Sequence, residues 1–166
     1  MPAEAAPRIV DVGPERHAEC LRVLNEAFAT ETAQFGITRE NTPSNPAFWG
    51  PADLARVVAR PADLFAVADP SILGCAFALA SRSRPGTWEL RHLAVAPDAR
   101  NRGHGEALVA EAARRARAAG GQRLRIGIVA QNLRLSLWYR RLGFASLDVT
   151  SYPGLLFDVE HLELSL

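Results

Sequence analysis

The sequence predicts a single α/β domain, residues 1–166, in which about four helices flank a mixed, mostly antiparallel sheet of about six or seven strands. Three observations support this. The chain has 166 residues, of which 48% are hydrophobic and 22% charged, so it can bury a core. Short apolar runs separated by turn residues occupy its middle, between amphipathic helical patterns. One strand–helix–strand unit, residues 87–130, is long enough for a parallel crossover.

The N-terminal part begins with alternation over residues 8–12, which predicts a strand. Pro14 opens a helical pattern that runs to about residue 30. Residues 31–50 lack a clear period and contain several Pro, Gly, Asn and Thr residues, so we expect a long loop, of the kind that is often functional. A short helix is expected over residues 51–60.

The middle and the C-terminal part carry most of the predicted strands. The two apolar runs before Arg82 are separated by an Asp-Pro-Ser turn, and the short connections around them favour antiparallel pairing. Gly120-Gly121 ends the first long helix after them, and Gly143 ends the second. The predicted strands are residues 64–68, 72–80, 87–96, 123–130, 144–152 and 155–164, and the predicted helices are residues 103–119 and 132–142.

The charges are unevenly distributed. Net charge is +1, and all 19 basic residues are Arg. Residues 82–141 hold 13 Arg against four acids, whereas the rest holds 6 Arg against 14 acids. A chain without Lys can have neither a Walker-type phosphate loop nor a lysine Schiff base. Cys20 and Cys75 match no metal or redox spacing, so we expect no metal and two small buried thiols.

Composition also bears on partners and location. We expect no membrane partner, because the longest apolar run is about nine residues and a bilayer needs about 20. We expect no nucleic acid, because the net charge is close to zero and the Arg-rich segment lacks interleaved aromatic residues. The first seven residues show no signal-peptide pattern, so we expect a cytoplasmic protein.

A turn over residues 100–105, with the sequence Arg-Asn-Arg-Gly-His-Gly, stands between a predicted strand and a predicted helix. Two glycines allow a tight turn whose amides point inward, and the helix N-terminus adds partial positive charge. Together with Arg100 and Arg102, this predicts a phosphate site. The dinucleotide fingerprint does not fit, because Leu108 replaces its third Gly and no acid follows the next strand.

Two motifs resemble those of the GNAT superfamily of acyl-CoA-dependent N-acyltransferases. The first is Leu-Ala-Val-Ala-Pro at residues 93–97, followed by Arg100-x-x-Gly103-x-Gly105. The second is Asn132 after the next strand, then Tyr139 and the pair Gly143-Phe144. Together they cover about a third of the chain, and the order of the predicted elements matches over nearly all of it. Leu135 departs from the small residue that many relatives carry there.

The resemblance implies that the co-substrate is acetyl-CoA. Its pyrophosphate would bind main-chain amides of the turn, and its pantetheine arm would lie along one strand and contact Asn132. An amide of that strand would polarise the thioester carbonyl. The implied CoA-binding residues are Leu93, Ala94, Val95, Arg100, Arg102, Gly103, His104, Gly105 and Asn132.

The implied chemistry needs two proton-handling groups, because an amine attacks a thioester only when it is unprotonated. Glu89 matches the position of the base in several family members. His92, expected on the opposite strand face, and a water chain are the alternatives. Tyr139 would protonate the departing thiolate. Arg91 shares the strand face of Glu89, where it would orient the substrate or pair with that carboxylate.

The implied activity is transfer of acetyl to a primary amine of an unidentified acceptor. Phe35 and Trp49, in the loop expected at residues 31–50, are the candidate acceptor-binding residues. An acyl-CoA sensor without turnover is the alternative function, and a homodimer through the C-terminal strands is a possible assembly. Three further arginines are expected to form a solvated helix face: Arg114, Arg115 and Arg117.

Overall fold

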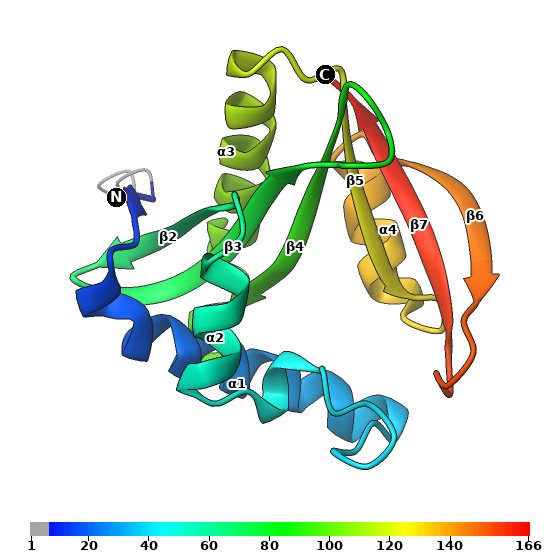
Figure 1. The fold of residues 1–166 in the computed structure, drawn as a ribbon, viewed down its shortest axis with the longest axis horizontal. Coiled ribbons are helices and arrows are strands. Elements are labelled where there is room, and N and C mark those ends of the chain that lie inside the picture. The colour runs from blue at the N-terminus through cyan, green and yellow to red at the C-terminus, as the bar shows by residue number, and fades with distance from the viewer. Residues whose placement is uncertain (1–6) are drawn as a thin grey trace.

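The computed structural model describes residues 7–166, in which helices cover both faces of a seven-stranded sheet (Figure 1). The spatial order is β1-β2-β3-β4-β5-β7-β6, and every neighbouring pair is antiparallel except the parallel pair β4–β5. The predicted mixed fold with one parallel crossover is therefore confirmed. The strands are β1 (Ile9–Asp11), β2 (Asp63–Asp69), β3 (Ser71–Ala80), β4 (Thr87–Val95), β5 (Arg123–Val129), β6 (Ala145–Ser151) and β7 (Asp158–Ser165). The expectation that no signal peptide is present concerns residues that lie mostly outside the described part.

Four α-helices are found in the described part: α1 (His17–Phe35), α2 (Pro51–Val58), α3 (His104–Ala118) and α4 (Leu133–Arg141). Helices α1 and α2 pack on one face of the sheet, and α3 and α4 on the other (Figure 1). Each face therefore has its own apolar core. Because both faces are covered, β2 and β3 are continuous apolar runs rather than alternating ones.

Helix α1 is longer than its pattern predicts, since it continues to Phe35. Gly36 then ends it in a left-handed conformation, with φ of 66° and its N–H donating to the Thr32 carbonyl. The expected loop is therefore shorter, and it contains a 3-10 turn, Pro46–Phe48. The sequence pattern did not predict the last turn of α1, because the inward-facing residues of that turn, Glu31 and Thr32, are polar.

The sheet opens in its middle, between β4 and β5. Three residues of β4, Thr87–Glu89, pair with Arg123–Arg125, and then the strands part, whereas β5 continues to pair with β7 along its full length. Figure 1 shows the two strands diverging like the arms of a V. Beyond Glu89, this edge of β4 therefore faces a gap rather than a neighbouring strand.

A bulge in β4 lies beside this gap. Arg91 is opposite Phe77 and Ala94 is opposite Cys75, so two residues, His92 and Leu93, face one residue of β3. His92 has φ of 50°, in the left-handed region. The bulge breaks strand parity and turns the His92 ring to the α1 side, where Phe77 also packs. The prediction that His92 lies on the opposite face from Glu89 is therefore wrong.

One of the three arginines expected on a solvated face of α3 is instead an internal link. Arg114 and Arg117 are exposed, but Arg115 is largely buried. Its guanidinium donates to Asp11 of β1 at 2.6 Å and to Glu111 of its own helix at 2.7 Å.

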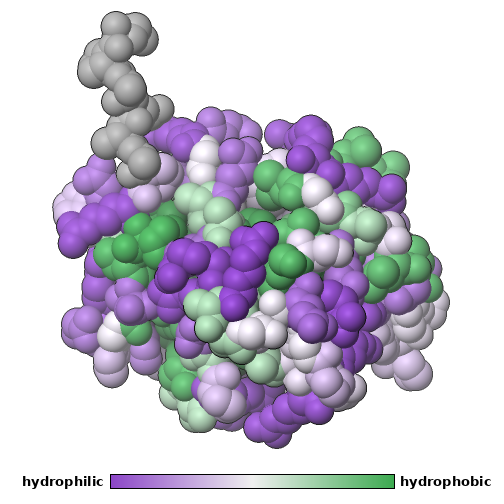
Figure 2. Space-filling model, turned by 90° about the horizontal axis from the view of Figure 1, so that it is seen from above, coloured by the Kyte–Doolittle hydropathy of each residue, from purple (hydrophilic) through white to green (hydrophobic). Residues whose placement is uncertain are grey.

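Viewed from above, the surface shows hydrophilic residues interspersed with smaller apolar areas (Figure 2).

The pKa of Glu111 is lowered to about 2, chiefly by the hydrogen bond from Arg114 and also by Arg115. Because the folded pKa lies below the ordinary value of 4.5, the carboxylate stabilises the fold above pH 4.5. That contribution is lost as the pH falls through about 2. We predict a smaller acid-induced fall in the free energy of unfolding for Glu111→Gln than for the unmodified protein, measured by urea denaturation between pH 5 and 2.

The control for this measurement is Glu106→Gln on the same helix. Glu106 is exposed and makes no ion pair among the described residues. This variant is expected to follow the unmodified protein. Equal pH dependence of the two variants would show that Glu111 does not stabilise α3 through its two arginines.

Candidate active site

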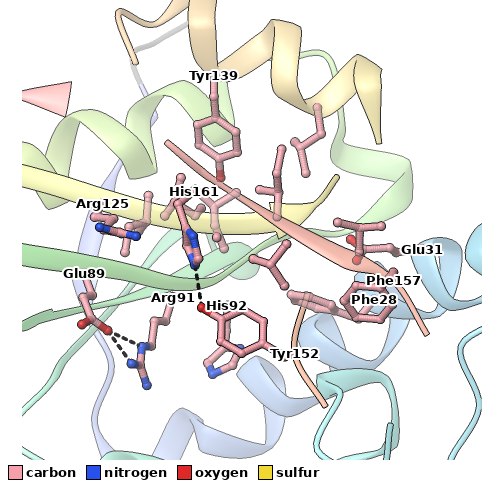
Figure 3. Close-up of a pocket in the computed structure, with 18 of the residues that line it drawn as sticks. Phe28, Glu31, Glu89, Arg91, His92, Arg125, Tyr139, Tyr152, Phe157 and His161 are labelled. Carbon is pink, nitrogen blue, oxygen red and sulfur yellow. Dashed lines mark hydrogen bonds and ion pairs between the residues drawn. The ribbon is translucent and has the colours of Figure 1, made fainter. Parts of the chain in front are cut away.

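A cavity of about 450 Å³ lies where β4 and β5 part. Its walls come from β4, β5, β7, α1 and α4, together with the connection between β6 and β7 (Figure 3). Four predicted site residues line it, Glu89, Arg91, Leu93 and Tyr139, and so does Leu135. Because the cavity passes through the gap in the sheet, groups from both faces meet in it.

Tyr139 reaches the cavity from the α4 side. Its ring packs edge-on against Trp138 and Phe144, with centroids 4.8 and 5.2 Å away. Its hydroxyl points into the cavity (Figure 3). Burial raises the pKa of Tyr139 well above its ordinary value, and the charge of Glu31 raises it further. The phenol is therefore protonated at physiological pH, as a proton donor must be.

Glu89 and Arg91 lie across the cavity from Tyr139, on the α1 side of the sheet (Figure 3). Arg91 donates to one oxygen of Glu89 from two nitrogens, with 2.8 Å from Nε to Oε2. The predicted sharing of one face is therefore observed, and the two side chains form an ion pair. They stand at the closed end of the V, where Glu89 still lies opposite Arg125 of β5.

His92 sits among aromatic rings. Its ring centroid is 4.7 Å from that of Trp49, 5.7 Å from Phe77 and 6.4 Å from Phe28. Burial, helped by the charge of Arg91, lowers the pKa of His92 to about 4. A neutral imidazole with so low a pKa is a weak base, so the alternative assignment of His92 as proton acceptor gains no support.

The two aromatic residues predicted to bind the acceptor do not line the cavity. Trp49 is buried against His92, and its indole N–H donates to the Ser44 carbonyl at 2.9 Å. Phe35 is the last residue of α1. The aromatic residues that line the cavity on the α1 side and at the β6–β7 connection are Phe28, Tyr152 and Phe157.

A hydrogen-bonded group that the sequence did not reveal joins β6 and β7. His161 Nδ1 lies 2.6 Å from Asp148 Oδ1, and His161 Nε2 lies 3.2 Å from the Tyr152 hydroxyl. His161 and Tyr152 both line the cavity (Figure 3). The only signal in the sequence is the presence of these residue types on a predicted hairpin. Their pairing depends on a register shift in β6 that no pattern shows.

Glu31 of α1 was also missed, since it falls in the segment expected to be a loop. Its carboxyl lines the cavity beside Phe28 and Phe157 (Figure 3). Burial raises the pKa of Glu31 above its ordinary value. This part of the cavity therefore combines aromatic side chains with a carboxyl group that is partly shielded from water.

The turn over residues 100–105 has the geometry expected of a phosphate-binding loop. Asn101 and Gly103 have φ of 60° and 80°, and α3 begins at His104. The Ala107 N–H donates to the Gly103 carbonyl at 3.0 Å, so the amides before it precede the helical ladder. Gly105 lies against α4, and a Cβ there would be 3.1 Å from the Trp138 ring.

The two arginines of the turn have different surroundings. Arg102 is exposed. Arg100 turns back toward α1, where its guanidinium donates to the Ala27 carbonyl at 3.2 Å and to Thr30 Oγ1 at 3.1 Å. It also donates to the Val95 carbonyl at 3.3 Å. Arg100 thus ties the end of β4 to α1, and Arg102 is the arginine available to a ligand at the turn.

Asn132 caps α4, because its Oδ1 accepts the N–H of Leu135 at 3.1 Å. Leu93 lines the cavity, while Ala94 is buried in the α1-side core and Val95 packs against both cores. No group of three potential metal ligands occurs within residues 7–166. In the same part of the chain, every helix is too short or too polar to cross a membrane.

The fold and the turn define the class. The family model of the GNAT acetyltransferases matches residues 28–144, and the chain belongs to this family. It is therefore an acyl-CoA-dependent N-acyltransferase, with acyl-CoA as co-substrate. A search of curated proteins found no match.

Solved structures support the same fold. A Bacillus subtilis acetyltransferase in complex with CoA is 19% identical, with a TM-score of 0.69 over 97% of this chain and 99% of that one. The ribosomal-protein-S18-alanine N-acetyltransferase of Escherichia coli is 16% identical, with a TM-score of 0.73 over 96% and 94% of the chains. An N-acetyltransferase from Staphylococcus aureus is 21% identical, with a TM-score of 0.73 over 97% and 99%.

The surroundings of His92 give a direct test of the site geometry. We predict that His92 stays neutral on acidification until the pH approaches 4, because protonation would place a charge among aromatic rings. Imidazole ring signals in an NMR titration between pH 7 and 4.5 measure this, with assignment by loss of the signal in His92→Asn. A midpoint near 6.5 would contradict the buried position.

Proposed function

We propose that this enzyme transfers acetyl from acetyl-CoA to a primary amine by direct attack within a ternary complex. One observation carries the proposal: the Tyr139 hydroxyl faces, across the gap between β4 and β5, a set of polar groups on the opposite face of the sheet. A thioester lying in that gap would have a proton donor on one side and room for an amine on the other.

Main-chain groups would hold the CoA. The amides of Arg102, Gly103, His104 and Gly105 would bind the pyrophosphate, with the positive end of α3 behind them. The pantetheine arm would lie along Leu93–Val95, on the edge of β4 that faces the gap. Asn132 stands at the start of α4, where it would meet the same arm.

The reaction would need little from the protein beyond positioning and proton transfer. The amine nitrogen attacks the thioester carbon and gives its proton to a base or to water, the C–S bond breaks, and the departing thiolate takes the Tyr139 proton. A backbone amide near the bulge of β4 would polarise the carbonyl, a contact worth roughly 3 kcal/mol in other enzymes. No acyl-enzyme is required.

The two cysteines fit direct transfer. Cys20 and Cys75 are both fully buried in the α1-side core. A hydrogen bond with Cys20, and then burial, raise the pKa of Cys75. A thiol that is both inaccessible and hard to ionise is a poor nucleophile, so a covalent acetyl-cysteine is not expected.

The acceptor is tested by thiol release from acetyl-CoA with a panel of amines: lysine, spermidine, an aminoglycoside and a short peptide with an N-terminal alanine. We expect release that depends on at least one amine, with N-acetylated product identified by mass spectrometry. CoA binding without release under every amine would favour the acyl-CoA sensor. Location in the cytoplasm and assembly as a homodimer are further predictions.

Replacement of Tyr139 by Phe removes the proposed acid and keeps the ring that packs on Phe144. We predict that kcat falls about 100-fold or more while the KM for acetyl-CoA changes little, because general acids contribute roughly 10²–10⁴-fold. Steady-state kinetics measure both constants. Leu137→Ala, an exposed site on the same helix, is the control, and equal kcat values for the two variants would remove Tyr139 from the reaction.

A further inference from the structure

We propose that His161, oriented by Asp148, is the catalytic residue that accepts the proton of the attacking amine. This inference rests on the proposed acetyl transfer. It concerns a residue outside both sequence motifs, in β7, the last strand of the chain. Neither the expected Glu89 nor His92 is assigned this role.

The hydrogen bonds define which nitrogen of His161 is free to act. Nδ1 lies 2.6 Å from a carboxylate oxygen of Asp148, and an ionised carboxylate can only accept, so Nδ1 carries the hydrogen. Nε2 then keeps its lone pair. The Tyr152 hydroxyl, 3.2 Å from Nε2, donates to it from within the cavity. A carboxylate that accepts the Nδ1 hydrogen orients an imidazole so that its Nε2 can take a proton.

Asp148 is itself held in place. The Thr150 hydroxyl donates to Oδ1 at 2.9 Å, and Arg125 approaches Oδ2 at 3.5 Å. Hydrogen bonds from His161 and Thr150 lower the pKa of Asp148, and the nearby positive charge of Arg125 does so too. The carboxylate therefore stays ionised and keeps the imidazole in one tautomer.

The gap in the sheet gives His161 access to the reacting groups. His161 lies opposite Gly127 of β5, beyond the last residue of β5 that pairs with β4. Gly127 has no side chain, and a Cβ there would be 3.5 Å from His161 Cδ2 and 3.1 Å from Val159 Cγ1. The glycine thus leaves space beside the ring on the cavity side. The imidazole is mostly enclosed, with 14% of its side chain exposed.

Other titratable groups around the cavity are less suited. Glu89 already accepts two N–H groups from Arg91, at the closed end of the V. His92 is enclosed by aromatic rings. The charged or titratable groups that face His161 across the cavity or from neighbouring strands are Asp148, Tyr152, Arg125, Glu89, Arg91, His92, Glu31, Arg84 and Tyr139.

The proposed step is balanced. An amine that replaces the Tyr152 hydroxyl at Nε2 donates its N–H there. As the new C–N bond forms and the C–S bond breaks, that proton passes to Nε2, and the thiolate takes the proton of Tyr139. Solvent then takes the proton from His161 and returns one to Tyr139. The net reaction converts an amine and a thioester into an amide and a thiol.

The kinetic test follows kcat from pH 5.5 to 8.5 at saturating acetyl-CoA, with the best amine of the panel at saturation. We expect His161→Gln to lower kcat at pH 7.5 about 100-fold and to abolish the fall of kcat on the acid side, since the base must be unprotonated to act. Asp148→Asn is expected to lower kcat about as much as His161→Gln, because the amide no longer keeps the hydrogen on Nδ1 and the lone pair on Nε2. His17→Gln, on the first turn of α1 and outside the cavity, should match the unmodified enzyme.

A second variant guards against a folding defect. In His161→Ala, added imidazole is expected to restore part of the lost kcat, which a purely structural role would not allow. If His161→Gln keeps both its kcat within about two-fold and its acid-side fall, His161 is not the base. Absence of any rescue from a correctly folded His161→Ala, together with an unchanged pH profile, leads to the same conclusion.

A further readout does not depend on the acceptor. Long-range ¹H–¹⁵N correlation spectra at pH 8 report the tautomer of each of the four histidines, and loss of signals in His161→Gln assigns this one. We expect hydrogen on Nδ1 in the unmodified protein and a redistribution in Asp148→Asn. Hydrogen on Nε2 would overturn the proposal. Failure of every amine, with the Nδ1–H tautomer present, would instead count against acetyl transfer itself.

Discussion

The separation of β4 and β5 after three paired residues is the constraint on which the rest of the site depends. A continuous sheet would satisfy its backbone groups internally and leave no path between its faces. Beyond Glu89, β5 stays paired with β7 and β4 stays paired with β3. The edge of β4 that faces β5 is therefore open to an extended ligand. The cavity, the reach of Tyr139 and the access to His161 all follow from this divergence.

Local patterns in the sequence predicted most of the fold and one half of the site. The glycine turn opens α3, Asn132 caps α4 and Tyr139 lies within α4, so each stands on the element that the sequence predicted for it. His92 shows where that reasoning fails. Its face depends on a bulge, which is set by how β4 pairs with β3 and leaves no mark in the alternation. The length of α1 was underestimated because Glu31 faces the cavity and interrupts the apolar stripe.

The other half of the site is built from contacts between distant parts of the chain. His161 contacts Asp148 across a hairpin with a shifted register, and no motif contained either residue.

The arginine-rich segment, residues 82–141, also could not be interpreted from local sequence alone. Residues 82–141 hold 13 Arg against four acids, but Arg91, Arg115 and Arg125 pair with carboxylates of the protein itself. Composition counts charges and does not show which of them are already neutralised.

The walls of the acceptor side differ in how firmly they are attached. Helix α1, which carries Phe28 and Glu31, is tied through Arg100 to the end of β4 and is packed along the core. The connection that carries Tyr152 and Phe157 is a short surface link between two strands, far in sequence from the glycine turn at residues 100–105. If the cavity receives the acceptor as proposed, residues 152–157 are a segment whose exchange would alter acceptor selectivity without changing the glycine turn at residues 100–105.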